Sequence, residues 1–122
     1  MLILTLHVKP LSTNAAWRGR HFPTAAKTEY ETRLRLSLPK VAVVGKPYYR
    51  IGFDFYLKNF AQIDYDNCLK VTQDCLVKRG ILTDDCKIID ARIRKFPAKA
   101  DRIVIRLEGM ELHEPPPEGA TP

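Results

Sequence analysis

Four segments of the chain alternate between apolar and other residues, with the period of two that is typical of β-strands. They are residues 2–8, 48–57, 87–96 and 102–107. The clearest is 48–57, where Phe53 and Phe55 lie on the opposite parity from Asp54, which is therefore not assigned to a site. The last two segments are separated by a short connection, so we expect them to form a hairpin.

The segment 24–38 has its apolar residues at the spacing of an amphipathic helix. Thr24 is the expected N-cap, and Pro39 ends the helix because proline has no N–H group to continue it. The spacing assigns Ala26, Tyr30, Leu34 and Leu38 to one side of this helix and Lys27, Glu31 and Arg35 to the other.

A second helix is predicted between Asp64 and Gly80, and it concentrates acidic residues on a basic protein. Asp66, Lys70 and Asp74 recur every four residues and therefore share one helix face. Gly80 supplies the stop, because glycine readily adopts the left-handed conformation that ends many helices. The opposite, apolar stripe consists of Cys68, Leu69, Thr72, Cys75 and Leu76.

Together these elements predict an α+β fold, a single small domain in which a mixed, mostly antiparallel sheet is covered by two helices. The chain has 122 residues, which is long enough to build one hydrophobic core. We expect the folded domain to occupy residues 1–110. The remaining residues 111–122 are rich in proline and glutamate and are predicted to be a disordered tail.

Charge and cysteine content narrow the functional classes. Lys and Arg number 20 against 14 Asp and Glu, and the net charge of +6 suits a polyanionic partner such as nucleic acid without proving one. The 3 cysteines form no Cys-x-x-Cys pair, so a structural zinc site is not expected. The first strand is too short for a signal peptide or a membrane span, and a cytoplasmic location is expected.

Two pairs of aspartates flank the second helix, Asp64 with Asp66 at its start and Asp84 with Asp85 beyond its end. Taken singly, these residues are explained as a helix cap, a partner of the helix dipole and turn residues. Taken together with Lys70, they form a candidate Mg²⁺ site, because Mg²⁺ prefers hard oxygen ligands and relieves the repulsion between clustered carboxylates. Which of these two interpretations holds depends on whether the two pairs of aspartates meet in the folded chain.

The same segment contains Asp-x-Asp-Asn-x-x-Lys-x-x-x-Asp-x-Leu followed by Gly-x-x-x-Asp-Asp. This pattern resembles the core signature of the RusA family of Holliday junction resolvases, and the order of the other elements is similar up to about Leu107. An early Pro-x-Ser-x-Asn-like element at residues 10–14 also matches. The residues that match the core signature are Asp64, Asp66, Asn67, Lys70, Asp74, Leu76, Gly80, Asp84 and Asp85.

The resemblance implies a RusA-like fold and a crossover junction endodeoxyribonuclease, which hydrolyses phosphodiester bonds in recombination and repair. Such an enzyme acts as a homodimer and resolves four-way branched DNA by paired symmetric cuts, with Mg²⁺ as cofactor and Mn²⁺ as the alternative ion. The expected catalytic residues are Asp64, Asp66, Lys70 and Asp85. The expected metal ligands are Asp64, Asp66, Asp85 and Asp84.

DNA contacts are expected from two regions. The loop 9–23 mixes Trp17 with Arg18 and Arg20, so the arginines can contact phosphates while the indole stacks on an unpaired base. Alternatively, Trp17 packs at the core edge and the arginines are only solvated. A second basic row, on the predicted hairpin, includes Arg92, Arg94 and Arg106. The full predicted set of DNA-binding residues is Asn14, Trp17, Arg18, Arg20, Asn67, Arg92 and Arg94.

Two other functions remain compatible with the sequence. The first is a non-catalytic DNA-binding or structural module whose acidic residues only cap the second helix. The second is a metal-dependent nuclease that uses the same carboxylates on flaps, other branched DNA or RNA. A panel of substrates tested with and without Mg²⁺ distinguishes these classes.

Overall fold

The computed structural model describes residues 1–11, 17–18, 22–39, 46–64 and 69–117, with the backbone alone at 17–18 and 22–23. Four predicted site residues, Asn14, Arg20, Asp66 and Asn67, lie outside these ranges, as do the side chains of Trp17 and Arg18. Among the described residues, no helix has the length and apolar character needed to cross a membrane.

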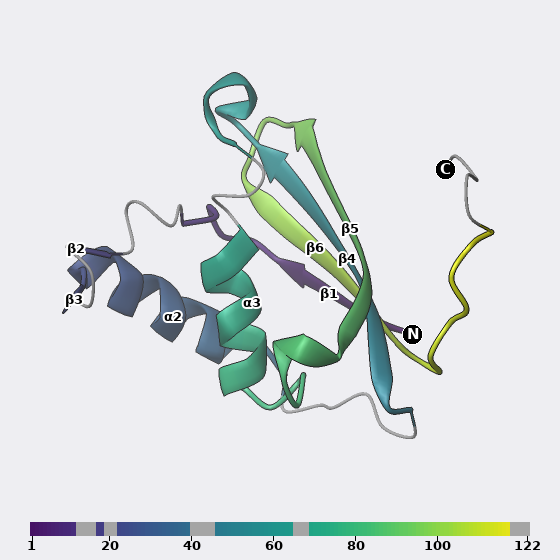
Figure 1. Cartoon of the computed structure of the whole chain (residues 1–122). Coiled ribbons are helices and arrows are strands. Elements are labelled where there is room, and N and C mark those ends of the chain that lie inside the picture. The colour runs from purple at the N-terminus through teal and green to yellow at the C-terminus, as the bar shows by residue number, and fades with distance from the viewer. Residues whose placement is uncertain (12–16, 19–21, 40–45, 65–68, 118–122) are drawn as a thin grey trace.

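The core of the protein is a 4-stranded mixed sheet with the order β1-β6-β4-β5 (Figure 1). Its strands are β1 (Leu2–Leu6), β4 (Tyr48–Leu57), β5 (Ile88–Pro97) and β6 (Arg102–Met110). The pairs β1–β6 and β4–β6 are antiparallel, whereas β4 and β5 are parallel. The predicted α+β class with a mixed, mostly antiparallel sheet is therefore confirmed.

The expected hairpin between the last two strands is wrong, because β4 lies between β5 and β6. The connection after β5 crosses the end of β4 and is bonded to it on the way. The Ala98 N–H donates to the Leu57 carbonyl at 3.1 Å, and the Lys58 N–H donates to the Asp101 carboxylate at 3.0 Å. These bonds pair backbone groups at the end of β4 with the connection between β5 and β6. The connection is short enough for a hairpin, but it passes over the end of β4 and leads to the strand on its other side.

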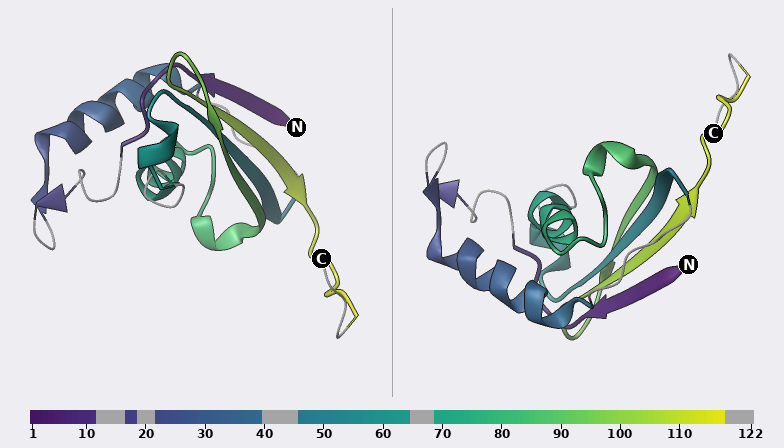
Figure 2. Two further views of the ribbon diagram at one scale, coloured as in Figure 1. Left: turned by 90° about the horizontal axis from the view of Figure 1, so that it is seen from above. Right: turned by 90° about the horizontal axis from the view of Figure 1, so that it is seen from below.

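Helices α2 (Ala25–Ser37) and α3 (Leu69–Lys78) lie on the same side of the sheet (Figure 2). The face of the sheet toward them is apolar and buried along β4 and β6, as expected from the alternation in β4. Two very short strands, β2 (Trp17–Arg18) and β3 (Phe22–Pro23), pair antiparallel within the segment predicted to be a loop. The largest fully buried side chains include Ile51, Phe53 and Phe55 of β4, Ile103, Ile105 and Leu107 of β6, Leu34 of α2 and Leu76 of α3.

One boundary of each helix follows a local sequence signal. The Thr24 hydroxyl accepts a hydrogen bond of 3.2 Å from the Lys27 N–H, which confirms the predicted N-cap. Gly80 has φ of +82°, which confirms the predicted stop of the second helix. The assignment of sides on α2 was wrong at two positions, since Ala26 is exposed and Lys27 is buried. Lys27 buries its aliphatic stem and pairs its ammonium with Glu31, so a charged residue occupies the inner side.

The two helices are joined by a buried hydrogen bond of 2.8 Å between the hydroxyls of Tyr30 and Thr72. We expect Tyr30→Phe to lower the free energy of unfolding by about 1 kcal/mol, because it removes a buried bond while keeping the aromatic ring. Urea denaturation followed by circular dichroism measures this difference. An unchanged unfolding midpoint would show that the hydrogen bond between Tyr30 and Thr72 does not stabilise the fold.

Candidate active site

The second acidic pair lies in a short 3-10 helix, η3 (Asp85–Lys87), which directly precedes β5. Asp84 caps this helix, because its carboxylate accepts a hydrogen bond of 3.1 Å from the Cys86 N–H. Backbone donation from Cys86, followed by a hydrogen bond with Asp85, lowers the pKa of Asp84 below its ordinary value. Asp84 is therefore an exposed, ionised carboxylate at neutral pH.

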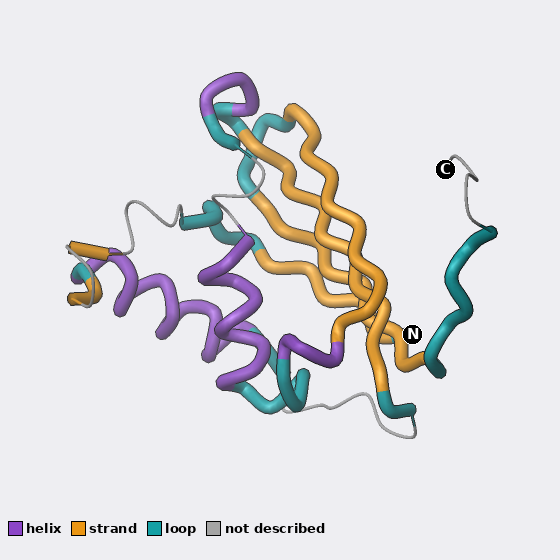
Figure 3. Tube along the Cα trace, in the orientation of Figure 1, coloured by secondary structure: helices purple, strands orange, loops and turns teal. Residues whose placement is uncertain are grey.

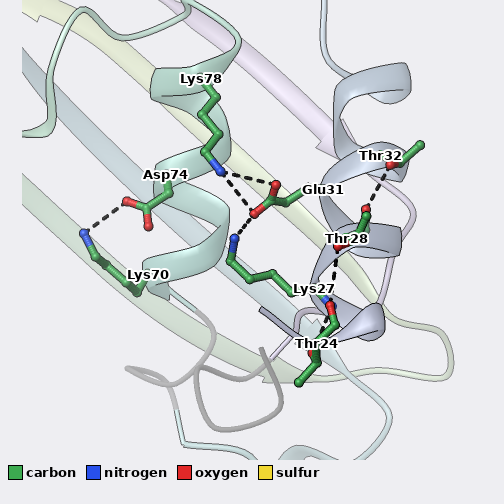
Figure 4. A network of polar contacts seen from close by, with 8 residues as sticks. All are labelled: Thr24, Lys27, Thr28, Glu31, Thr32, Lys70, Asp74 and Lys78. Atoms are coloured by element: carbon green, nitrogen blue, oxygen red, sulfur yellow. Dashed lines mark hydrogen bonds and ion pairs between the residues drawn. The ribbon is translucent and has the colours of Figure 1, made fainter. Parts of the chain in front are cut away.

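Asp85 belongs to a polar cluster that we call the Lys70 cluster, formed by Lys70, Gln73, Asp74 and Asp85. The Lys70 ammonium lies 3.0 Å from an oxygen of Asp74 and 3.6 Å from Asp85 Oδ2. The Gln73 amide donates to the same Asp85 oxygen at 3.5 Å. The hydrogen bond to Asp74 outweighs the opposing effect of burial and raises the pKa of Lys70, so its ammonium stays charged. Figure 4 shows Lys70 and Asp74 together on one side of α3.

Asp64, the described member of the first acidic pair, lies toward the other end of the sheet. Asp64 is exposed and follows the 3-10 helix η1 (Phe60–Gln62), which comes directly after β4. Because β4 and β5 are parallel and in register from Arg50 to Leu57, η1 and η3 lie at opposite ends of this strand pair (Figure 3). Helix α3 spans the region between them, and Lys70 in its first turn reaches Asp85.

The structure does not assemble the predicted ligand set from the residues it describes. Within those residues, no three Asp, Glu, His or Cys side chains are grouped to hold a metal ion. Asp66, which is central to the predicted set, lies outside them, so the metal site stays a prediction. The donor chemistry nevertheless fits a hard cation, because the carboxylate oxygens of Asp64, Asp84 and Asp85 are the hard ligands that Mg²⁺ prefers, and Asp64 and Asp84 are exposed.

Comparison with protein families decides how this arrangement is interpreted. The model of the family described as endodeoxyribonuclease RusA matches residues 21–108, which include Asp64, α3 with Lys70, and Asp85. The chain belongs to the RusA endodeoxyribonuclease family. This confirms the family expected from the sequence, and membership implies an endonuclease that acts on Holliday junction DNA. No curated protein matches the chain.

In this RusA-family domain, the predicted DNA contacts Arg92 and Arg94 lie on the outer face of the sheet, the face directed away from α2 and α3. Arg94 is engaged there with Asp54, through bonds of 2.8 and 2.9 Å, and Arg106 pairs with the same carboxylate. Arg92 is exposed. The outer face comprises Arg50, Asp54 and Tyr56 of β4, Asp90, Arg92, Arg94 and Phe96 of β5, and Arg102, Arg106 and Glu108 of β6.

A cavity of about 540 Å³ lies between α2 and α3 of the RusA-family domain. Several of its polar groups are paired within the protein. Lys78 lies 3.2 Å from both carboxylate oxygens of Glu31, and Arg79 donates to the Leu38 carbonyl at 3.3 Å. Burial raises the pKa of Cys75 in this cavity to about 11, so its thiol is not a nucleophile at neutral pH. The side chains that line the cavity therefore connect the two helices, and they offer no evident catalytic group.

Two residues that contact the acidic segments were not found from the sequence: Gln73 beside Asp85, and Lys95, whose ammonium is bonded to the Ile63 carbonyl next to Asp64. Gln73, which contacts Asp85, lies three positions after Lys70, and this spacing on a helix could have indicated a shared face. Lys95 occupies the inward parity of β5, two residues after Ile93, where the alternation predicts an apolar side chain. A charged residue at such a position is the signal that could have identified it.

Proposed function

We propose that this RusA-family protein is a Mg²⁺-dependent endonuclease that resolves four-way DNA junctions as a homodimer, by paired symmetric cuts. Family membership carries the general activity. The contact between Lys70 and Asp85 supports the finer assignment, because it joins the acidic helix and the second acidic pair in one cluster. That cluster combines a cation that can contact phosphate with carboxylates that can bind metal, a combination suited to metal-dependent phosphodiester hydrolysis.

The residues have separate roles in this proposal. Asp64, Asp66 and Asp85 hold the ion, with Asp84 acting through water. The bound Mg²⁺ supplies Lewis acidity and an acidified water. Lys70 holds the scissile phosphate or neutralises the departing oxygen, and its raised pKa keeps it cationic for this role. Asp74 and Gln73 orient Lys70 and Asp85 through the bonds described above.

The symmetry of the substrate supports the proposed homodimer. A four-way junction has approximate two-fold symmetry, and resolution requires two matched cuts. Two identical protomers related by a two-fold axis supply two matched sites. Sedimentation of the protein with a fluorescent junction measures the stoichiometry, which we expect to be two protomers per junction.

The experiment that tests the proposed function is a substrate panel. A four-way junction, a flap, a linear duplex and an RNA hairpin are each incubated with the protein, with and without Mg²⁺. We expect paired cuts in the junction with Mg²⁺ and no cutting without it. Preferential cutting of the flap or the hairpin would favour the other nuclease class. Binding to the junction without any cutting would favour the non-catalytic module.

We further expect junction affinity to fall steeply with salt, because each phosphate neutralised contributes a slope of about 0.9 log units per log salt. Arg92→Ala should lower that slope by about 1 if Arg92 contacts a phosphate as predicted. Fluorescence anisotropy without Mg²⁺, measured at several salt concentrations, gives the slope. The matched control is Arg50→Ala, because Arg50 lies on the same outer face but is paired with Asp90 at 2.8 Å. Equal slopes for wild type and Arg92→Ala would remove Arg92 from the interface.

A further inference from the structure

Lys95 makes an unusual set of contacts near the end of β5. Its ammonium donates to the Phe60 carbonyl at 2.6 Å and to the Ile63 carbonyl at 2.8 Å. The same nitrogen lies 4.5 Å from the centroid of the Phe60 ring. Lys95 is half-buried, and it shares the helix-facing side of the sheet with its neighbour in register, Phe55.

These contacts fix the segment that carries Asp64. One carbonyl belongs to Phe60, the first residue of η1, and the other to its C-cap Ile63, so one ammonium is bonded to both ends of this short helix. Ile63 also packs against the core, and its carbonyl belongs to the peptide unit that leads directly into Asp64. Bonds from a charged donor are stronger than neutral ones, and the adjacent ring face adds attraction for the cation. The backbone before Asp64 is therefore tied to β5.

Strand β5 thereby connects both candidate acidic segments. Asp85 lies in η3, which runs directly into the first residue of β5, and Lys95 near the other end holds the backbone beside Asp64. A strand is a stiff element because its backbone is bonded to its neighbour along its length, here from Arg50 to Leu57 of β4. Strand β5 and Lys95 thus contribute, together with α3, to the relative placement of Asp64 and Asp85.

We propose that Lys95 is a positioning residue that holds Asp64 in place for binding of the divalent cation; this inference rests on the proposed function. Lys95 is not itself a phosphate contact, because two of the three donors of its ammonium are directed at backbone carbonyls. Groups that orient metal ligands typically change metal affinity by about 10- to 100-fold when they are removed.

The test uses the full-length variant Lys95→Met, which keeps an unbranched apolar side chain against Phe60 and removes the donors. We expect the Mg²⁺ concentration that gives half-maximal junction cleavage to rise by about 10-fold or more. The cleavage rate at saturating Mg²⁺ and the junction affinity without metal should stay within about threefold of wild type. Calorimetric titration of the DNA-free protein with Mg²⁺ should show the same shift in affinity.

Two controls separate positioning from a general loss of stability. Lys99→Met removes an exposed lysine from the connection between β5 and β6, and should leave the Mg²⁺ requirement unchanged. Tyr30→Phe weakens the domain at the interface between α2 and α3, far in the sequence from the segment before Asp64. It should also leave the Mg²⁺ requirement unchanged. If Lys95→Met does not fold, Lys95→Gln is measured in its place. This variant retains an amide donor on a shorter side chain, and we again expect a higher Mg²⁺ requirement.

The outcomes are distinguishable. Wild-type cleavage with an unchanged Mg²⁺ requirement and unchanged calorimetric affinity in the Lys95 variant would overturn the positioning role and leave the proposed function standing. Wild-type Mg²⁺ binding that weakens in the variant, without any cleavage of the junction panel, would support the positioning role and overturn the proposed function. A wild-type protein that neither binds Mg²⁺ nor cuts would overturn both.

Discussion

Replacing Asp85 by asparagine should abolish junction cleavage, lowering the single-turnover rate by about a thousandfold or more, while junction binding is retained or improved. The substitution keeps the size of the side chain but removes one negative charge beside Lys70, 3.6 Å away in the wild-type protein. An amide is a poorer ligand for a hard cation, so the proposed metal site loses a carboxylate. Removing an acid from a DNA-binding surface also reduces repulsion of the phosphates. Asp64→Asn is expected to behave in the same way.

The matched control for this prediction is Asp90→Asn. Asp85 and Asp90 have side chains with the same exposed fraction, 39%, but Asp90 pairs with Arg50 on the outer face of the sheet. We expect Asp90→Asn to cut junctions at a rate within about threefold of wild type, because its charge lies outside the proposed site. Single-turnover cleavage and anisotropy measure rate and binding on the same substrate. If Asp85→Asn loses binding but retains cleavage, the assigned role of Asp85 is wrong.

The largest effect on stability is expected at Asp54. Its side chain is only 3% exposed and accepts bonds from Arg94 and Arg106, which link β4 to both of its neighbours in the sheet. Removing one partner from a buried ionic group destabilises proteins by roughly 3–5 kcal/mol. We expect a smaller loss for Asp54→Ala, about 2–3 kcal/mol, because the two arginine side chains are 39% and 40% exposed and regain water.

Urea denaturation near neutral pH measures this loss, and Asp90→Ala serves as its control. Asp90 lies on the same outer face, but both members of its pair with Arg50 are exposed, so we expect a loss of at most about 1 kcal/mol. Equal losses in the two variants would show that burial of Asp54 adds no stability. Asp54 lies on the face away from the Lys70 cluster, so its replacement should act on stability without altering the proposed catalytic residues.

The contribution of Asp54 should also depend on pH. Burial disfavours the charged form of its carboxylate, but the hydrogen bonds from Arg94 and Arg106 outweigh this and lower its pKa from the ordinary value of 3.8. A lowered pKa stabilises the folded state above 3.8, and this stabilisation disappears as the pH falls through the lower folded pKa. We therefore expect the stability difference between wild type and Asp54→Ala to narrow below pH 4. If the stability difference between wild type and Asp54→Ala stayed constant down to pH 2, the ionised Asp54 carboxylate would not be its origin.

The tertiary structure alone revealed why Asp54 is buried. Its parity in β4 correctly placed it on the face opposite Phe53 and Phe55, and such a position normally faces solvent. Arg94 comes from β5 and Arg106 from β6, so the contacts that cover Asp54 depend on which strands lie beside β4. Sequence separation between these residues is large, and no local pattern encodes their pairing.

The sequence by itself determined the features that depend on local interactions. The period of two in β4, the cap at Thr24 and the stop at Gly80 each arise within a few residues, so they could be predicted from the chain alone. The RusA signature is likewise confined to one stretch, 64–85, and identified the family without coordinates.

Strand order and the surroundings of the acidic residues were decided only by the tertiary structure. A four-residue connection, 98–101, is compatible with a hairpin, but bonds to Leu57 and Lys58 carry it across β4 instead. The same long-range packing brings Lys70 to Asp85 and anchors the segment before Asp64 to Lys95. The physical reason is that these contacts join residues far apart in the chain, so their energy depends on the whole arrangement of strands and helices rather than on neighbouring residues.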